Sequence, residues 1–152
     1  RGRKDIDNGE PWGDLKARQQ DLHGTRIDGE LALRAIDELP LIATLAARAQ
    51  GPTRIRDAAE LRVKESDRIS KTAQMLESFG VPVEEHPDGL TIHGDPYRPL
   101  EPGRVDATGD HRIAMCAALL ARHAGSDTRI TGAESVSSSF PEFYATLDEL
   151  SR

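Results

Sequence analysis

The chain has 152 residues, enough for one ordinary domain, and its 37% hydrophobic and 30% charged residues exclude a purely disordered polypeptide. A net charge of -6 argues against a nucleic-acid partner. The sequence has neither a signal peptide nor an apolar run of the roughly 18–20 residues that cross a bilayer. We therefore expect a soluble, cytoplasmic protein with no membrane contact. The single Cys116 excludes an internal disulfide and a multi-cysteine metal site, and we expect no metal.

Periodicity and turn residues divide the chain into short elements. The first residues carry no periodic pattern, so we expect a flexible lead-in over 1–14 and a folded domain over 15–152. Apolar residues at helical spacing predict the helices, alternation predicts the strands, and Gly or Pro ends them. The predicted elements, in chain order, are strands at 15–20 and 24–28, a helix over 39–49, a strand over 53–56, a helix over 67–79, a hairpin of 81–85 with 90–93, a loop over 94–103, a helix over 111–123, a strand over 128–131 and a helix over 141–150.

An internal repeat organises these elements. The segment LAAR at 45–48 corresponds to LLAR at 119–122, a shift of 74, and TRI at 53–55 corresponds to TRI at 128–130, a shift of 75. Each copy runs helix, Gly turn, strand, loop, helix, but only the first continues into a hairpin. We therefore predict an α/β fold of βαβαββ units whose final copy lacks its closing strands, as in a piece of a larger protein. Chance similarity between Ala-rich helices is the alternative.

The richest charged stretch is ELRVKESDR at 60–68, where a loop enters a predicted helix. Ser66 or Asp67 is a suitable N-cap, and Lys64 and Arg68, four residues apart, would share a face on a helix. A helix N-terminus with Lys and Arg beside it is a good receptor for a phosphate or carboxylate. A solvated helix start held by salt bridges explains the same pattern, and by pattern alone it is the more common case.

A second polar stretch, TGDHR at 108–112, also begins a predicted helix. Thr108 or Asp110 is a suitable N-cap, and His111 and Arg112 add donors for an anion. A capped helix with a surface His is again the simpler interpretation. The 74-residue shift places His111 on Asp37, so if the repeat is real, several charged loops lie at one end of a layered domain.

Four segments in order resemble the 5-enolpyruvylshikimate-3-phosphate synthase family. The segment ELRVKESDRI at 60–69 is similar to one family signature, and GDHRIAM at 109–115 is similar to a second. AIDELP at 35–40 and SFPEF at 139–143 resemble two more, with family-like spacing. The resemblance covers nearly the whole chain but only the C-terminal part of the family enzyme.

The resemblance implies an α/β (α+β) fold of repeated βαβαββ units in which this chain forms one incomplete domain. Residues 15–152 are then a partial enolpyruvyl transferase domain of about two units, and the missing N-terminal part of the same protein is an implied partner. The family motifs that grip shikimate 3-phosphate are absent from this sequence. We therefore expect the chain alone to be inactive as an enzyme, and its unpaired strand edges to favour self-association.

The implied reaction transfers the enolpyruvyl group of phosphoenolpyruvate to the 5-hydroxyl of shikimate 3-phosphate and releases phosphate. It uses no metal or organic cofactor. By resemblance, Glu65 transfers a proton at the enolpyruvyl methylene, and Asp37 holds and deprotonates the hydroxyl. Lys64 carries a proton between hydroxyl and phosphate and stabilises charge.

The resemblance also implies residues that bind the substrates. Arg68 and Arg112 are expected to hold the carboxylate and phosphate of phosphoenolpyruvate, with His111 in support. Two positions depart from a common family pattern: Glu60 stands where some members have an Asn near the shikimate ligand, and Ser138 stands where many have a Lys that contacts phosphoenolpyruvate. The loss of that Lys weakens the implied grip on the ligand.

Two other functions compete with this interpretation. One is enolpyruvyl transfer to UDP-N-acetylglucosamine by a related enzyme, against which the KESDR and DHR segments argue. The other is a non-catalytic anion-binding module of the same fold. The retained Asp37, Lys64, Glu65, Arg68 and Arg112 argue against the second alternative, because a decayed site has no reason to keep them.

Overall fold

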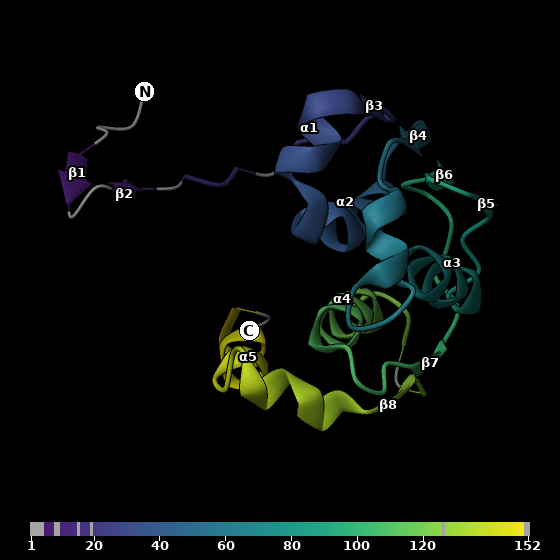
Figure 1. Ribbon diagram of the computed structural model, residues 1–152. Coiled ribbons are helices and arrows are strands. Elements are labelled where there is room, and N and C mark those ends of the chain that lie inside the picture. Colours follow the sequence, from purple (N-terminus) through teal and green to yellow (C-terminus); the bar gives the residue numbers. More distant parts are fainter. Residues whose placement is uncertain (1–4, 8–9, 15, 19, 126, 151–152) are drawn as a thin grey trace.

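The computed structural model describes residues 5–7, 10–14, 16–18, 20–125 and 127–150, and Figure 1 shows their arrangement. Strands, α-helices and short 3-10 helices (η) alternate along the chain. They are β1 (Asp5–Asp7), β2 (Glu10–Trp12), β3 (Arg26–Ile27), α1 (Gly29–Arg34), η1 (Ile36–Glu38), α2 (Leu39–Ala46), β4 (Gly51–Ile55), η2 (Ala59–Val63), α3 (Arg68–Ser78), β5 (Val83–His86), β6 (Gly89–Gly94), β7 (Arg104–Asp106), α4 (His111–Ala121), β8 (Arg129–Thr131), η3 (Ala133–Ser138) and α5 (Phe143–Leu150).

The first repeat forms a mixed four-stranded sheet in the order β3-β4-β6-β5. β3 and β4 run parallel, as the helical connection through α1 and α2 requires, and the β5–β6 hairpin completes the sheet in antiparallel register. A two-residue turn of Pro87 and Asp88 closes that hairpin, within the segment predicted from its turn residues. The C-terminal end of β4 leads directly into the 57–68 segment.

The second repeat has the same order of elements but a smaller sheet. β7 and β8 pair in parallel across α4 and form a sheet of two strands. η2 begins at Ala59 and η3 at Ala133, 74 residues apart, and α3 and α5 begin at Arg68 and Phe143, 75 residues apart. The predicted repeat is therefore present in the fold. Among the described residues, β7 and β8 pair only with each other, so each has one unpaired edge.

Three helices form the centre of the molecule. α2, α3 and α4 pack against one another, and α3 also contacts β5, β6 and β7 (Figure 1). Their inner faces carry fully buried aliphatic residues such as Ile69, Leu76 and Ile113, with alanines that let the helices approach closely. Gly80 ends α3 in the left-handed conformation, at φ +77°, as predicted for a helix stop. The packing of these helices brings the N-termini of α3 and α4 together.

Several elements differ from the sequence-based expectations. The structure adds α1, β7 and the 3-10 helices, all too short for a periodic signal. β1 and β2 pair within the predicted lead-in, and Figure 1 shows them well apart from the other elements. No strand occurs at the described residues of 15–20, and the predicted strand at 24–28 shortens to β3. Among the described residues, no helix is both long and apolar enough to cross a membrane.

Candidate active site

Three cationic side chains meet at Asp37, which lies in η1 just before α2. Nη1 of Arg68 is 3.2 Å from Oδ1 of Asp37, and Nζ of Lys64 is 3.8 Å from the same oxygen. Nη1 of Arg112 donates to the backbone carbonyl of Asp37 at 2.7 Å. Residues far apart in the sequence are therefore brought together at the starts of α2, α3 and α4.

Arg68 and Asp110 form a buried ion pair at the base of this cluster. Each side chain is only 1% exposed, and Nε of Arg68 lies 2.9 Å from Oδ2 of Asp110. The hydroxyl of Ser66 donates to the same carboxylate oxygen at 2.7 Å, and Nη2 of Arg68 lies 2.6 Å from Oε2 of Glu65. The guanidinium of Arg68 is thus surrounded by three carboxylates, because Asp37 also contacts it.

The helix caps explain why these residues lie where they do. Asp67 caps α3 by accepting a hydrogen bond from the backbone N–H of Ser70 at 3.0 Å, and Asp110 caps α4 by accepting one from Arg112 at 3.1 Å. Both caps are among the candidates that the sequence analysis proposed. Asp110 is therefore both the N-cap of α4 and the counter-ion of Arg68. These two contacts join the starts of α3 and α4.

The segment between η2 and α3 presents Lys64 and Glu65. Lys64 has an extended backbone after η2, so it does not share a helical face with Arg68, as the spacing had suggested. Its Nζ lies 2.8 Å from Oε1 of Glu60, and this hydrogen bond raises the pKa of Lys64 above its usual value, so Lys64 is a cation at neutral pH. Glu65 is half exposed and contacts Arg68.

Arg62 was not singled out in the sequence, yet it fastens this segment to the sheet. Its guanidinium donates to the backbone carbonyls of His86 and Pro87 at 2.8 Å each, to Glu85 at 2.9 Å and to Asp67, the cap of α3, at 2.7 Å. The β5–β6 hairpin thereby fixes the position from which the cluster residues project. An Arg within a charge run gave no signal of this, because its partners in the hairpin, Glu85, His86 and Pro87, lie more than 20 residues away in the sequence.

Other residues expected at the site take different positions. His111 is half-buried at the first position of α4, next to Arg112. Ser138 lies exposed in η3 and donates to the backbone carbonyl of Ser135 at 2.7 Å, and no contact joins it to the cluster among the residues described. Asp110, Ser66 and Glu38 are members of the cluster that the sequence analysis did not assign to the site. The sequence analysis named Ser66 and Asp110 only as candidate helix caps.

Acidification is expected to weaken the fold through Asp110. Burial raises the pKa of this carboxyl, but hydrogen bonds from Arg68 and Ser66 outweigh burial and hold the pKa below its ordinary value. A carboxyl whose pKa is lower in the folded state stabilises the fold at pH values above its unfolded-state pKa of about 3.9. This stabilisation is lost as the pH falls through the lower pKa of the folded state. We expect the free energy of unfolding, measured in urea, to fall below about pH 4.

The Asp110→Asn variant tests this expectation, because it should lose part of that pH dependence. Asp21→Asn is the matched control, since Asp21 is exposed and has no described hydrogen bond. A wild-type curve that is flat between pH 4 and pH 2, or an identical slope in both variants, would contradict the assignment.

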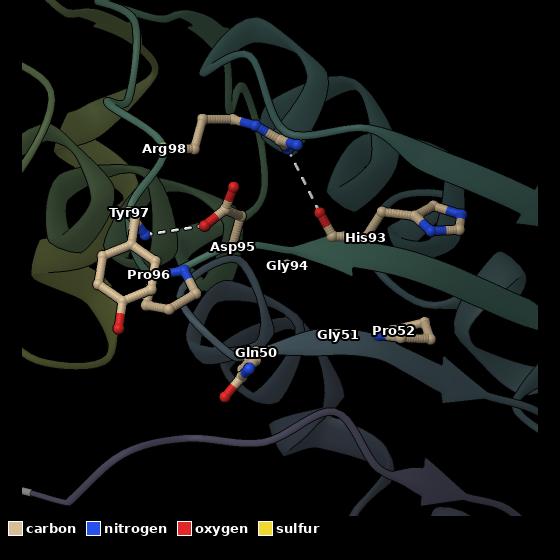
Figure 2. Close-up of a pocket in the computed structure, with 9 residues that line it drawn as sticks. All are labelled: Gln50, Gly51, Pro52, His93, Gly94, Asp95, Pro96, Tyr97 and Arg98. Atoms are coloured by element: carbon tan, nitrogen blue, oxygen red, sulfur yellow. Dashed lines mark hydrogen bonds between the residues drawn. The ribbon is translucent and has the colours of Figure 1, made fainter.

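A separate cavity of about 310 Å³ lies at the other end of the central strands. It is lined by the start of β4 and the end of β6, where Gly51 pairs with Gly94, whereas the cluster follows the opposite end of β4. Figure 2 shows that Arg98 donates to the carbonyl of His93, and Asp95 accepts from the N–H of Tyr97. These polar groups serve the fold of their own loop, so this cavity is not part of the candidate site.

The side chains of the cluster are suited to binding charged organic ligands. Among the described residues, no group of three or more His, Cys, Asp or Glu side chains is arranged to hold a metal ion. The cluster instead offers three cations and half-exposed carboxylates at two helix N-termini, whose backbone N–H groups favour anions.

Comparison with known proteins decides the family. The family model of EPSP synthase (3-phosphoshikimate 1-carboxyvinyltransferase) matches residues 5–147. This chain belongs to the EPSP synthase family. The 3-phosphoshikimate 1-carboxyvinyltransferase of Acaryochloris marina is 47% identical over 142 residues, which are 93% of this chain and 31% of the relative. That of Pelotomaculum thermopropionicum is 50% identical over 135 residues, 88% of this chain and 31% of the relative.

Solved structures of EPSP synthases agree with the family assignment. An EPSP synthase from Acinetobacter baumannii aligns with a TM-score of 0.87 and 34% identity, covering 97% of this chain and 34% of that protein. The enolpyruvyl transferase NikO from Streptomyces tendae shares the fold, with a TM-score of 0.67 at 23% identity, and covers 98% of this chain and 32% of NikO. The expected enolpyruvyl transferase fold is confirmed. The chain spans about a third of the length of the EPSP synthases that it matches.

Proposed function

We propose that this chain supplies part of the active site of an EPSP synthase, which transfers the enolpyruvyl group of phosphoenolpyruvate to the 5-hydroxyl of shikimate 3-phosphate. In this reaction the hydroxyl oxygen bonds to C2 of phosphoenolpyruvate while C3 gains a proton. Loss of a proton from C3 and of phosphate from C2 then restores the double bond. The observation that carries the proposal is the meeting of Lys64, Arg68 and Arg112 at Asp37.

The proposed roles follow from the exposure and charge of each group. Glu65 is half exposed, so its carboxyl can reach a ligand and is the group that exchanges a proton with C3. Asp37 is also half exposed and accepts the proton of the attacking hydroxyl. Lys64, held as a cation by Glu60, stabilises the charge that develops on oxygen as the hydroxyl attacks and the phosphate leaves.

The arginines divide into two kinds. Arg112 is partly exposed, at 29%, and is the stronger candidate for direct contact with a carboxylate or phosphate. Arg68 is fully buried on Asp110, so its contact with phosphoenolpyruvate stays a prediction, whereas its effect on the positions of Asp37 and Glu65 follows from their contacts. His111 and Ser138 also stay predictions as substrate contacts.

The balance of charge supports a need for the remainder of an EPSP synthase. The cations Lys64, Arg68 and Arg112 are outnumbered by the carboxylates around them, which are those of Asp37, Glu38, Glu60, Glu65 and Asp110. Both proposed substrates are anions. The cluster therefore needs further cations, which we propose come from the part of the enzyme that this chain does not contain. Closure of that part over the site would also exclude water.

We expect the chain alone to release no phosphate from phosphoenolpyruvate and shikimate 3-phosphate. Phosphate release should appear when the same sequence is carried in a full-length EPSP synthase, assayed beside the chain at equal concentration. Replacement of shikimate 3-phosphate by UDP-N-acetylglucosamine in the full-length assay should abolish turnover. Turnover by the chain near the full-length rate would refute the need for the remainder. Absence of turnover in a folded full-length protein would refute the proposed function and favour a non-catalytic module.

A further inference from the structure

A second cavity opens beside the charged cluster, between α2, α4 and the segment that joins η3 to α5. Its volume is about 200 Å³, and its apolar lining includes Leu41, Met115, Leu119, Phe140 and Phe143. It is distinct from the cavity in Figure 2, with which it shares no lining residue. None of these apolar side chains has a role in the proposed reaction.

The cavity suits one small ring or a branched aliphatic group. Apolar cavities of about 150 Å³ are known to accept a benzene-sized guest, and this one is of similar size. Phe140 and Phe143 lie edge to face, with ring centroids 5.8 Å apart, and Phe140 is 40% exposed. A third ring could pack against this pair in the same geometry, which aromatic side chains prefer.

Two opposite charges stand side by side on the same cavity. Asp37, Glu38 and Arg112 all line it. The carboxylate of Asp37 is paired with Lys64 and Arg68, whereas Nη1 of Arg112 lies 3.1 Å from Oε1 of Glu38. Among the described residues, Nε and Nη2 of Arg112 and Oε2 of Glu38 take part in no hydrogen bond. The pair therefore keeps donors on one member and an acceptor on the other, next to an apolar hollow.

We propose that this cavity binds an apolar α-amino acid in its zwitterionic form. An α-amino acid carries a carboxylate, an ammonium and a side chain on one carbon, and these match Arg112, Glu38 and the apolar lining in turn. A simple carboxylate would leave Oε2 of Glu38 without a donor, and a simple amine would leave Nε and Nη2 of Arg112 without an acceptor. The zwitterion satisfies both charges without breaking the existing ion pair.

Binding of the amino acid does not depend on the proposed function, but the inhibition that we expect from it does. Because Arg112 belongs also to the candidate active site, a bound amino acid would compete with an anionic substrate for its guanidinium. If the proposed function holds, the amino acid is then an inhibitor of the full-length enzyme that acts through Arg112.

Titration of the chain with L-phenylalanine tests the site, by calorimetry or by ligand-observed NMR. We expect saturable binding with one site per chain. Three analogues each lack one feature: 3-phenylpropionate lacks the ammonium, phenethylamine lacks the carboxylate, and glycine lacks the side chain. Each should bind at least tenfold more weakly than L-phenylalanine.

A variant locates the binding. Glu38→Gln should weaken the binding of L-phenylalanine at least fivefold. It should leave the binding of 3-phenylpropionate unchanged or slightly stronger, because only the amino acid has an ammonium that uses the carboxylate of Glu38. Glu30→Gln is the matched control, since Glu30 is 86% exposed and lies outside the cavity, and it should change neither ligand. Both substitutions replace an exposed carboxylate by an amide of nearly the same shape, so we expect both variants to fold, which circular dichroism checks.

Three results would each overturn the proposal: no saturable binding of L-phenylalanine, equal binding of 3-phenylpropionate, or equal behaviour of the two variants. The assay contains no phosphate or phosphoenolpyruvate, so its outcome is separate from that of the turnover assay. A chain that binds L-phenylalanine as expected, within an enzyme that fails to turn over, would refute the proposed function alone.

Discussion

Replacement of Arg68 by methionine is expected to lower the free energy of unfolding by about 3–5 kcal/mol, the cost of removing one partner of a buried ion pair. Arg68 and Asp110 are each 1% exposed. Without the guanidinium, the partners of the Asp110 carboxylate among the described residues are Ser66 and the N–H of Arg112. Methionine retains most of the apolar stem, so the loss reports the charge and its hydrogen bonds rather than a cavity.

Urea unfolding followed by circular dichroism measures this effect. Arg34→Met is the matched control, because Arg34 is 78% exposed and its pair with Glu30 is 4.0 Å long, so the change should stay within about 0.5 kcal/mol. The double variant with Asp110→Asn should recover part of the loss, since it no longer contains an uncompensated buried charge. A loss for Arg68→Met as small as that of the control would contradict the buried pair.

In a full-length EPSP synthase that carries this sequence, Glu65→Gln is expected to lower kcat by about 10²–10⁴-fold, the usual contribution of a positioned general acid or base. The amide has nearly the same shape as the carboxyl but does not exchange protons at C3 of phosphoenolpyruvate. Affinity for phosphoenolpyruvate should change little, because Glu65 carries no positive charge to bind it. The variant also removes the negative charge that Glu65 places beside Arg68, so its stability must be measured beside its rate.

Phosphate release under saturating substrates gives kcat for this comparison. Glu77→Gln is the matched control, since Glu77 is exposed on α3 and outside the cluster, and its kcat should equal that of the wild type. A decrease of less than tenfold in a stably folded Glu65→Gln enzyme would remove Glu65 from the proton-transfer role and leave it as a partner of Arg68.

Local sequence determined the elements and their repetition. The helical spacing of Ile69, Ala73 and Leu76 specified α3, Gly80 specified its end, and Asp67 specified its start through an N-cap. These features depend on residues within a few positions of one another, so a single sequence displays them. The same is true of the polar stretches that begin α3 and α4. The 74-residue repeat is visible because two such local segments recur along the sequence.

Only the tertiary structure decided which groups meet and which stay exposed. Arg68 was expected to face a ligand, yet packing of α2, α3 and α4 places it against Asp110, 42 residues away, and hides it from solvent. Whether a charged side chain at a helix start faces water or a counter-ion depends on how neighbouring helices approach. That approach is set by the summed burial of many apolar side chains, a property of the whole core that no local motif contains.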